Sequence, residues 1–566
     1  MNSAGDLTPT PMPAAGRSWL ARHRILLVPA GGALAIGAVT AAALLLLAKP
    51  ANTVEKMVPV SAQIAGFAYL DPSLTQKVNL LRIAHRFPDY QTDKAINTRL
   101  DDAFKAAGLS FSGDVQPWLG SEVAFAAQLG EGKTADSPAA LFIASRDDAK
   151  AVATLARLRV GTWGKTMQWR DEQYGGVGVA VGSPASTGAR GGAYAYVDHV
   201  VVIAASDTLI KEIIDTDQGR KSRLVDSKDY AATTASLPKD RLALVYVNAR
   251  SLVASVKSQA SKIVVAPGLS VNKKLKDLDA FQGIGLALSA RPDGMVADLT
   301  VKLDASKLTP ATRASLGHAG RPDKVLTWIP GSADGFLAVG NVNRTIQAWL
   351  DQPTNDPSLG QLATSFGLTG PHGILQHLTG DLGLEVELDK SLFPVGALVL
   401  GTDDAAAMRT FLGNLTALAA QGKAGKAGAA VHTETYLGTT ITTVTVPQLS
   451  QQGHLVPAYA VLDGMGIVAS SPDELKAIID AHHAGHTISA DPTYRQASAA
   501  SLTKPGTVAF VDLDKVVAAL RQSPFMGQAG RLDTKALATV TPLRALIVTA
   551  NSSADHSDAR VVLLIQ

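Results

Sequence analysis

The alternation of apolar and polar positions predicts the same strand–turn–strand–helix pattern at two places in the chain. The first copy runs from Ala193 to Asp215 and the second from Ala458 to Asp480, with ten of the 23 aligned positions identical. In the first copy two short apolar runs are separated by two polar residues, which is hairpin spacing. The helices begin at serine N-caps, Ser206 and Ser471, and Pro472 favours a helix start in the second copy.

Colinear matches on both sides of this pattern extend the repeat to about 240 residues, which is the length of a domain rather than of a solenoid unit. The matched segments, first copy before second, are Ala62–Gln76 with Ala333–Gln347, Pro117–Ala127 with His377–Glu387, Pro138–Leu155 with Pro394–Leu412, Tyr174–Gly182 with Tyr436–Val444, Asp240–Val253 with Gly506–Val517, and the closing hairpins Gly283–Leu303 with Arg544–Gln566.

Strands that arrive in hairpins, with helices between the hairpins, predict an α+β fold with largely antiparallel sheets and helices on one face. We therefore expect two tandem, homologous α+β domains at residues 58–307 and 325–566. A segment rich in proline, glycine and small residues, 308–324, is the expected linker. The groove between the two copies is the expected ligand site, because clefts between domains concentrate pockets.

An uncharged segment near the N-terminus predicts a membrane anchor. As a helix, residues 25–48 would reach about 36 Å, enough to cross a hydrocarbon core of about 30 Å. We expect a basic cytoplasmic tail at 1–24, a transmembrane helix at 25–48 and a linker at 49–57. The basic residues before the span place the N-terminus in the cytoplasm and the bulk of the chain outside. The alternative is a cleaved signal peptide, whose apolar region would be shorter.

Composition removes several classes of function. The chain has 52 Lys+Arg against 49 Asp+Glu, a net charge of only +3, and no dense basic stretch, so nucleic acid is not an expected partner. It contains no cysteine, which excludes disulfides, thiolate nucleophiles, cysteine-ligated metals and a lipidated cysteine anchor. Aromatic residues are sparse at 5%, so the cores must be mainly aliphatic and rich in alanine.

Two segments, Phe67–Tyr90 and Asp114–Gln128, resemble bacterial membrane-anchored proteins of the domain-of-unknown-function family 3352. The shared layout is a basic N-terminus, one membrane span, and an extracytoplasmic region with a Leu-Asp-Pro-Ser and a Pro-Trp-Leu-Gly stretch. The resemblance covers most of residues 55–566, although the second copy has His-Leu-Thr-Gly at 377–380. It implies no reaction, substrate, cofactor or catalytic residue.

Segments that look like catalytic or phosphate-binding motifs are incomplete. Residues 127–134 and 159–166 end like a phosphate-binding loop but lack its first glycine. The Ser-x-x-Lys matches at 270–273 and 501–504 lack the partner motifs of serine acyl-enzymes. The glycine-rich segment 175–182 has the wrong spacing for a dinucleotide loop and is expected to form a hairpin.

The remaining candidates are expected to have structural roles. His482 and His486 are four residues apart and could share a metal on a helix, but Gly485 predicts a helix end that leaves these histidines in solvent. The acidic pairs 147–148 and 403–404 are expected to cap helix N-termini. Trp118 is expected to anchor packing at a turn, with a ligand-stacking platform as the alternative.

We therefore predict no catalytic, cofactor-binding or metal-ligating residues, and no enzyme. The expected function is a membrane-anchored extracytoplasmic binding or scaffolding protein of the bacterial cell envelope. Its partners would be the bilayer, through residues 25–48, and another envelope protein, a lipid or a wall polymer. The alternative is an extracytoplasmic hydrolase or transferase with a non-standard site, which would need a cleft with converging His, Asp and Ser side chains. A third possibility is that one copy only stabilises the other.

Overall fold

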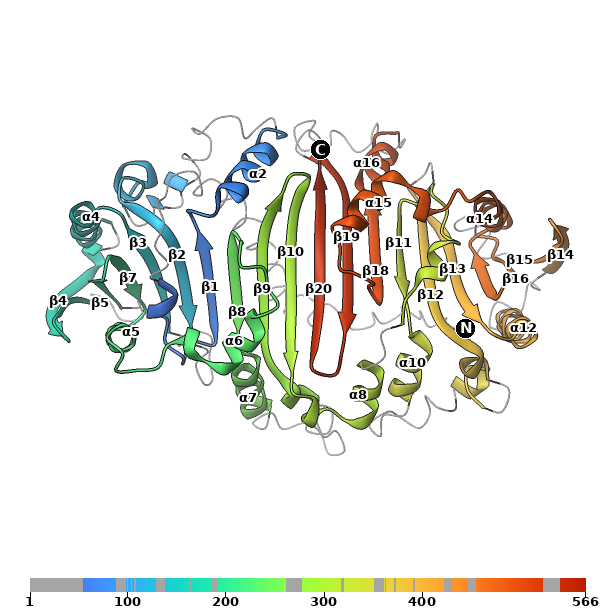
Figure 1. The fold of residues 1–566 in the computed structure, drawn as a ribbon, viewed down its shortest axis with the longest axis horizontal. Helices are drawn as coiled ribbons and strands as arrows, with labels where there is room; N and C mark the ends of the chain where they lie inside the picture. The colour runs from blue at the N-terminus through green and yellow to red at the C-terminus, as the bar shows by residue number, and fades with distance from the viewer. Residues whose placement is uncertain are drawn as a thin grey trace, which may run out of the picture.

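Figure 1 shows the fold as a broad antiparallel sheet with helices along its margins and faces. The computed structural model describes residues 54–87, 98, 100–102, 104–105, 108–128, 138–162, 164–184, 191–260, 277–316, 320–350, 361, 363–370, 373–389, 392–421, 430–445, 455–522 and 540–566. The expected transmembrane segment 25–48 lies outside these residues. Among the residues described, no helix is long and apolar enough to cross a bilayer.

The described strands form one 20-stranded sheet. The first ten are β1 (Ile64–Tyr69), β2 (Leu119–Ala127), β3 (Ala139–Ser145), β4 (Met167–Tyr174), β5 (Val177–Pro184), β6 (Gly192–Val197), β7 (Val200–Ala204), β8 (Ala243–Val247), β9 (Phe281–Arg291) and β10 (Gly294–Leu303). The other ten are β11 (Gly335–Val339), β12 (Leu378–Leu388), β13 (Pro394–Thr402), β14 (Ala430–Tyr436), β15 (Thr439–Thr445), β16 (Ala458–Leu462), β17 (Met465–Ala469), β18 (Thr507–Asp512), β19 (Leu543–Ser552) and β20 (His556–Ile565).

Both halves of the sheet have the same strand order. Neighbours run β4-β5-β6-β7-β3-β2-β1-β8-β9-β10 in the first half and β14-β15-β16-β17-β13-β12-β11-β18-β19-β20 in the second. In the centre of Figure 1, β10 pairs with β20 and joins the halves. Main-chain hydrogen bonds therefore occupy this join, where the sequence predicts a groove between separate sheets.

Helices pack on both faces of the sheet, whereas the sequence predicts one covered face. They are α2 (Leu74–Ala84), α4 (Asp148–Val160), α5 (Asp207–Asp217), α6 (Lys228–Thr234), α7 (Ala249–Ala260), α8 (Pro310–Leu316), α9 (Asp323–Leu326), α10 (Val342–Leu350), α12 (Ala405–Gln421), α14 (Pro472–Ala484), α15 (Pro492–Ala499) and α16 (Leu513–Gln522). In the first half, α5 and α6 share a buried cluster with Ala124 and Ala287, while α2 and α4 share another with Ile143 and Ala290, which lie on the opposite face.

Short helical turns complete the described structure. They are η1 (Val54–Met57), η3 (Phe111–Val115), η5 (Gly164–Thr166), η6 (Leu224–Asp226), η8 (Ala305–Lys307), η9 (Ile374–His377) and η11 (Ile488–Ala490). Val54 and Met57 are 0% and 1% exposed in the same cluster as α5, so residues 54–57 belong to the globular fold and not to the expected linker. The expected linker 308–324 contains α8 and the start of α9.

Local sequence signals correctly predict the caps and turns. Ser206 and Ser471 each accept a hydrogen bond from the N–H three residues later, at 3.2 and 3.1 Å. The β6–β7 turn has positive φ at Asp198 and His199, 42° and 63°, as a two-residue hairpin requires. Gly485 ends α14 in the left-handed conformation at φ 70°.

Candidate functional site

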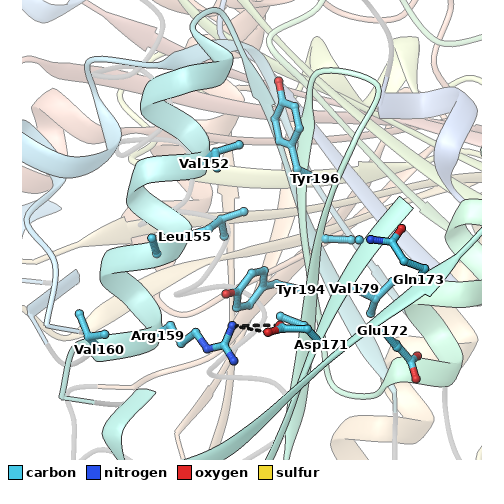
Figure 2. A pocket seen from close by; sticks show the side chains of 14 residues that line it. Val152, Leu155, Arg159, Val160, Asp171, Glu172, Gln173, Val179, Tyr194 and Tyr196 are labelled. Carbon is cyan, nitrogen blue, oxygen red and sulfur yellow. Dashed lines mark hydrogen bonds and ion pairs between the residues drawn. The ribbon is translucent and has the colours of Figure 1, made fainter. Parts of the chain in front are cut away.

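A cavity of about 700 Å³ opens between α4 and the curled end of the sheet formed by β4, β5 and β6. Figure 2 shows α4 on one side, with Val152 and Leu155 facing the strands and Val160 at the end of the helix. The sheet contributes small residues, which include Gly178, Ala180 and Ala195, and this leaves room for the cavity. Val152 and Val160 are 49% and 65% exposed, so the helix presents apolar surface to any ligand there.

One end of this groove is closed by an ion pair. Two contacts of 2.9 Å join Arg159 Nη1 of α4 to the two carboxylate oxygens of Asp171 on β4. The guanidinium also lies 5.5 Å from the ring centroid of Trp169. Trp169 is held in turn by Nε1, which donates to the carbonyl of Gly164 at 2.9 Å. Because the two charges neutralise each other, the groove offers little attraction for a strongly charged ligand.

Two tyrosines on β6 supply hydroxyl groups to the strand wall, which also contains the polar residues 171–173 of β4 and small apolar residues of β5. The ring of Tyr194 packs 5.3 Å from Trp169, and burial raises the pKa of its hydroxyl. Burial, followed by the nearby carboxylate of Asp148, also raises the pKa of Tyr196. Both tyrosines therefore stay neutral hydrogen-bonding groups at physiological pH. The lining suits an uncharged or amphiphilic molecule with an extended apolar part.

Polar contacts from β4 fix its hairpin against α5 and so hold the strand wall of the groove. Tyr174 Oη donates to the Asp215 carboxylate at 3.0 Å, and Lys211 Nζ lies 2.8 Å from Glu172. The second half repeats both contacts. Tyr436 Oη donates to Asp480 at 2.8 Å, and Lys476 Nζ lies 2.8 Å from Glu434. These contacts are part of the shared framework of the two halves.

The ion pair of the groove belongs only to the first half. Tyr174 and Tyr436 each end the first strand of a hairpin, and Asp171, three residues before Tyr174, corresponds to Thr433. Counting from the helix caps Asp147 and Asp404, Arg159 corresponds to Thr416. None of the sequence motifs identifies Arg159, Trp169 or Asp171 as site residues. The signal that could have found them is this difference between copies at otherwise matched positions.

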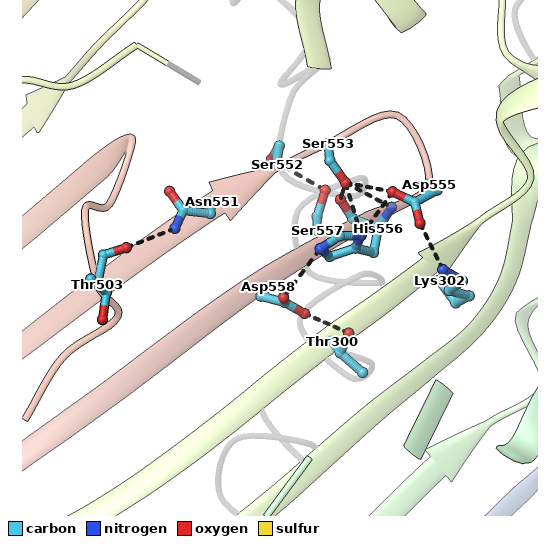
Figure 3. Close-up of polar contacts among 10 residues, drawn as sticks. All are labelled: Thr300, Lys302, Thr503, Asn551, Ser552, Ser553, Asp555, His556, Ser557 and Asp558. Atoms are coloured by element: carbon cyan, nitrogen blue, oxygen red, sulfur yellow. Dashed lines mark hydrogen bonds and ion pairs between the residues drawn. The ribbon is translucent and has the colours of Figure 1, made fainter. Parts of the chain in front are cut away.

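A second group of polar residues, shown in Figure 3, lies in the β19–β20 turn. Ser553 Oγ lies 2.8 Å from His556 Nδ1, and His556 Nε2 lies 3.5 Å from Asp558, an order of residue types also found in serine hydrolases. However, Ser553 Oγ also accepts from the main-chain N–H of His556 and donates to its carbonyl. Ser553 thus closes a four-residue turn, and its contacts are those of a structural side chain.

Asp555 and Asp558 connect that turn to the first half. Lys302 Nζ lies 3.0 Å from Asp555, and this contact, followed by those from Ser553 and His556, lowers the pKa of the Asp555 carboxyl. Thr300 donates to Asp558 at 2.6 Å. The charged groups of the turn are therefore engaged in holding β20 against β10, and Figure 3 shows both contacts crossing between these strands.

The structure gives the predicted site residues structural surroundings. His482 stacks on Trp328 with centroids 3.6 Å apart, and its Nδ1 lies 2.8 Å from the carbonyl of Thr327, rather than being free in solvent as predicted. Among the described residues no three His, Asp or Glu side chains are arranged to hold a metal ion. Asp147 and Asp404 cap α4 and α12, which confirms the helix-capping interpretation.

Trp118 is a packing anchor, as predicted. It is 2% exposed, and its Nε1 donates to the carbonyl of Asp114 at 2.6 Å and to Thr154 Oγ1 at 2.9 Å. The glycine-rich segment 175–182 forms the β4–β5 turn and strand, with φ of 59° and 81° at Gly175 and Gly176. The incomplete phosphate-loop segment 159–166 spans the end of α4 and η5, and most of the other, 127–134, lies outside the described residues.

Comparison with known proteins finds a family but no activity. The sequence model of the protein family of unknown function DUF3352 matches residues 24–565. No curated protein matches the chain. Crystal forms III and I of TP0453 are similar over 47% and 44% of this chain, covering 85% and 80% of theirs, at 11% and 9% identity. Their TM-scores of 0.24 and 0.23 are too low to support an argument.

Proposed function

This chain belongs to the DUF3352 family of proteins of unknown function, and we propose that it is a membrane-anchored, extracytoplasmic binding protein of the bacterial cell envelope. The uncharged segment 25–48 would be its single membrane span, with residues 1–24 in the cytoplasm. Only five residues, 49–53, separate this segment from the buried Val54. At about 3.5 Å per residue they reach at most about 18 Å, so the globular part would sit close to the bilayer.

The anchor predicts a clear cell-fractionation result. The full chain should stay in the membrane pellet after carbonate washing, while a variant in which Ala35 and Val39 are both changed to Lys should be released into the soluble fraction. Charged residues near the centre of a membrane helix each cost about 3 kcal/mol or more. The matched control changes Ala14 and Ala15, before the span, to Lys and should leave the chain in the pellet. Recovery of the unchanged chain in the soluble fraction would contradict the anchor.

The observation that carries the binding function is the groove between α4 and β4–β6. Its size is within the usual range of small-molecule sites, about 300–1,000 Å³. Its walls combine exposed aliphatic side chains of α4 with two neutral tyrosines of β6 and the polar residues 171–173 of β4. The ion pair at one end is absent from the matched positions of the second half, so it is not needed to fold the shared framework. We therefore assign ligand binding to the first half and a supporting role to the second.

Photo-cross-linking in living cells would test this assignment even while the ligand is unidentified. A photoreactive phenylalanine analogue in place of Val160 should form adducts that mass spectrometry detects on the full-length chain. The same analogue in place of Val60, which is 41% exposed and outside the groove, is the control. Adding Val152→Asp should lower the yield at residue 160 about tenfold, because it puts a charge where a bound ligand would cover this half-exposed valine, a contact worth on the order of 1.5 kcal/mol. Equal yields at 160 and 60 would contradict the proposal.

We further propose that the two halves are homologous copies of one unit. The supporting observations are the identical strand order and the matched contacts Tyr174–Asp215 with Tyr436–Asp480 and Glu172–Lys211 with Glu434–Lys476.

We also propose that this chain has no enzymatic activity. The Ser553–His556–Asp558 contacts are the best support for the hydrolase or transferase alternative, and the main-chain bonds of Ser553 weaken it.

A further inference from the structure

The centre of the sheet has one packed face, which includes the Asp298–Arg560 ion pair, and one open face, which is apolar. On the packed face, residues such as Leu244, Ala287 and Ile547 are at most 1% exposed. The neighbouring positions on the same strands, which point to the opposite side, are partly exposed along the middle of each strand from β8 through β9, β10, β20 and β19 to β18. Near the strand ends, Ala290 and Ile565 on this side are buried in a cluster with α2. An antiparallel sheet with one solvated face normally shows polar residues there. Here the burial alternates along each strand, but the open face carries apolar residues where polar ones are normal.

Two cross-strand rows define this open face. The first runs Val245, Leu286, Leu299, Ala559, Ala550, Thr507. The second runs Ala243, Leu288, Ala297, Val561, Val548, Ala509. Neither row contains a charged side chain, and Thr507 is the one polar residue in them. In the part of the chain that the structure describes, these rows form a nearly continuous aliphatic surface across six strands.

The rows continue into both outer parts of the sheet. In the first half they reach Phe125 and Leu141, which are 44% and 37% exposed. In the second half they reach Leu337 and Leu384, at 37% and 44%. The eleven strands from β3 to β12, about 4.8 Å apart, span about 50 Å, and two rows occupy about 14 Å along the strands. The resulting patch, on the order of 700 Å², exceeds the largest apolar patch of a typical soluble monomer.

Helices on the same side form walls around this face. Leu155 and Leu158 of α4 pack on Ile143 near one end, and Met408 and Leu412 of α12 pack near the other. A helix is about 10 Å thick, and two sheets pack face to face at about 10 Å. A second copy of this chain would therefore meet the helices before its own sheet could contact the open face. Thin, flexible molecules could pass between these helices and reach the open face.

Helix α2 at the margin of this face carries apolar residues on both sides, and its inner side packs Leu80 and Ile83 in the cluster that includes Ala290. It buries Gln76 and Asn79, which hydrogen-bond the main chain of Ala290 at 2.7 and 3.0 Å. Its outward side carries Leu74, Val78 and Leu81, at 77%, 44% and 39% exposure. These three residues share one side of the helix, facing away from the sheet. Such a stripe gains free energy when it enters an apolar phase such as a bilayer interface.

We propose that the open face binds the acyl chains of membrane lipids, with the Leu74–Val78–Leu81 stripe contacting the bilayer from which they come. The strands use their main-chain groups within the sheet, so the face provides no directional polar contact of the kind that protein interfaces contain. Acyl chains require none, because apolar burial alone stabilises them. The proposal rests on the proposed membrane anchor only for the source of the lipid.

The test uses the full-length chain in phosphatidylcholine vesicles that include a phosphatidylcholine with a photoreactive diazirine in one acyl chain. After irradiation, mass spectrometry should find adducts on the β9–β10 and β19–β20 peptides as well as on residues 25–48. Leu299→Gln should lower the β9–β10 adducts about tenfold, because it replaces one apolar contact by a polar group. Val60→Gln, at an exposed valine outside this face, is the control and should change nothing.

Each other outcome has a definite meaning. Adducts confined to residues 25–48 would overturn lipid binding by the open face and leave the anchor standing. Adducts on the open face with none on 25–48 would uphold lipid binding and contradict the anchor. Because the chain has no cysteine, Leu299→Cys adds a single thiol, and disulfide-linked dimers without lipid adducts would assign the face to a second copy and overturn the proposal. If Leu299→Gln fails to fold, the wild-type adduct map and the cysteine variant still decide.

Discussion

Replacing Glu385 by glutamine is expected to stabilise the protein at pH 9 by several kcal/mol while changing it little at pH 5. Glu385 on β12 is 1% exposed, and neither carboxyl oxygen has a hydrogen-bond partner of normal geometry among the described residues. Burial, and then the nearby carboxyls of Glu474, Glu387 and Asp334, raise its pKa to about 8. A neutral amide of the same shape removes the need to ionise this group in a buried acidic surrounding.

The direction of the pH dependence follows from proton binding. With an ordinary pKa of 4.5 in the unfolded chain and about 8 in the fold, the folded state holds more protons between these values. The stability present below about pH 4.5 is therefore lost as the pH rises towards 8. For one carboxyl this amounts to roughly 5 kcal/mol, at about 1.36 kcal/mol per pH unit. Glu122, which is 0% exposed with a pKa raised to about 8, acts in the same direction in the first half.

Urea denaturation midpoints at pH 5, 7 and 9 would measure this effect. The wild-type midpoint should fall as the pH rises, and the Glu385→Gln midpoint should fall less. The two midpoints should therefore be similar at pH 5, and that of the variant should be higher at pH 9. Glu434→Gln is the matched control, since Glu434 lies at the surface 2.8 Å from Lys476, and removing that pair should cost about 1 kcal/mol or less. A Glu385→Gln variant that loses the same stability at every pH would show that this carboxyl is ionised throughout.

Local signals in the sequence predict local structure because the physics that decides it is local. The serine caps at Ser206 and Ser471, the turn at Asp198 and His199, and the helix end at Gly485 each depend on a few neighbouring residues. The α+β class and the antiparallel pairing follow from the same hairpins. The family was also recognisable from sequence, through the segments Phe67–Tyr90 and Asp114–Gln128.

Pairings between strands that are distant in the sequence could not be predicted from local patterns. β3 pairs with β7 across α4 and the β4–β5 hairpin, and β10 pairs with β20 more than 250 positions later, so no local pattern specifies either contact. For this reason the sequence predicts two separate sheets and a groove between them. The Arg159–Asp171 pair was hidden for the same reason, since its two residues lie on different elements with unremarkable neighbours.

The buried carboxyls show a further limit of matching the two copies by pattern. Ser206 and Ser471 are equivalent caps, yet the third residue after them is Leu209 in one copy and Glu474 in the other. Leu209 packs in an aliphatic core, whereas burial raises the pKa of Glu474. At the level of apolar and polar positions Glu474 looks like a surface residue of a helix start. Only the strand behind it, with Glu385, shows that it faces another carboxyl.

Replacing Arg560 by methionine is expected to cost about 3 kcal/mol or more of unfolding free energy, because it leaves a buried carboxylate without its partner. Arg560 Nε lies 2.7 Å from Asp298 Oδ1, and Asp298 is 7% exposed. The pair lies directly across the β10–β20 ladder that joins the two halves. The double variant Asp298→Leu with Arg560→Met should recover most of the loss, since a well-packed apolar pair can replace a buried ion pair.

The position of this pair explains why opposite charges are found there. Asp298 and Arg560 are each the fifth residue of a ten-residue strand, and β10 and β20 are equivalent strands of the two halves. In two identical copies this position would face itself across the join, so an acidic or basic residue would meet a like charge in a buried site. One Asp and one Arg avoid that repulsion and favour the joining of unlike halves.

Denaturation midpoints of the single and double variants would test this explanation. Arg321→Met is the control, because Arg321 and its partner Asp323 are both about half exposed and the loss of this surface pair should cost little. A double variant as unstable as Arg560→Met alone would mean that Arg560 acts through its other contact, to the carbonyl of Ala500 at 3.4 Å, and not by neutralising Asp298. An Arg560→Met variant as stable as wild type would remove the ion pair as a determinant of the join.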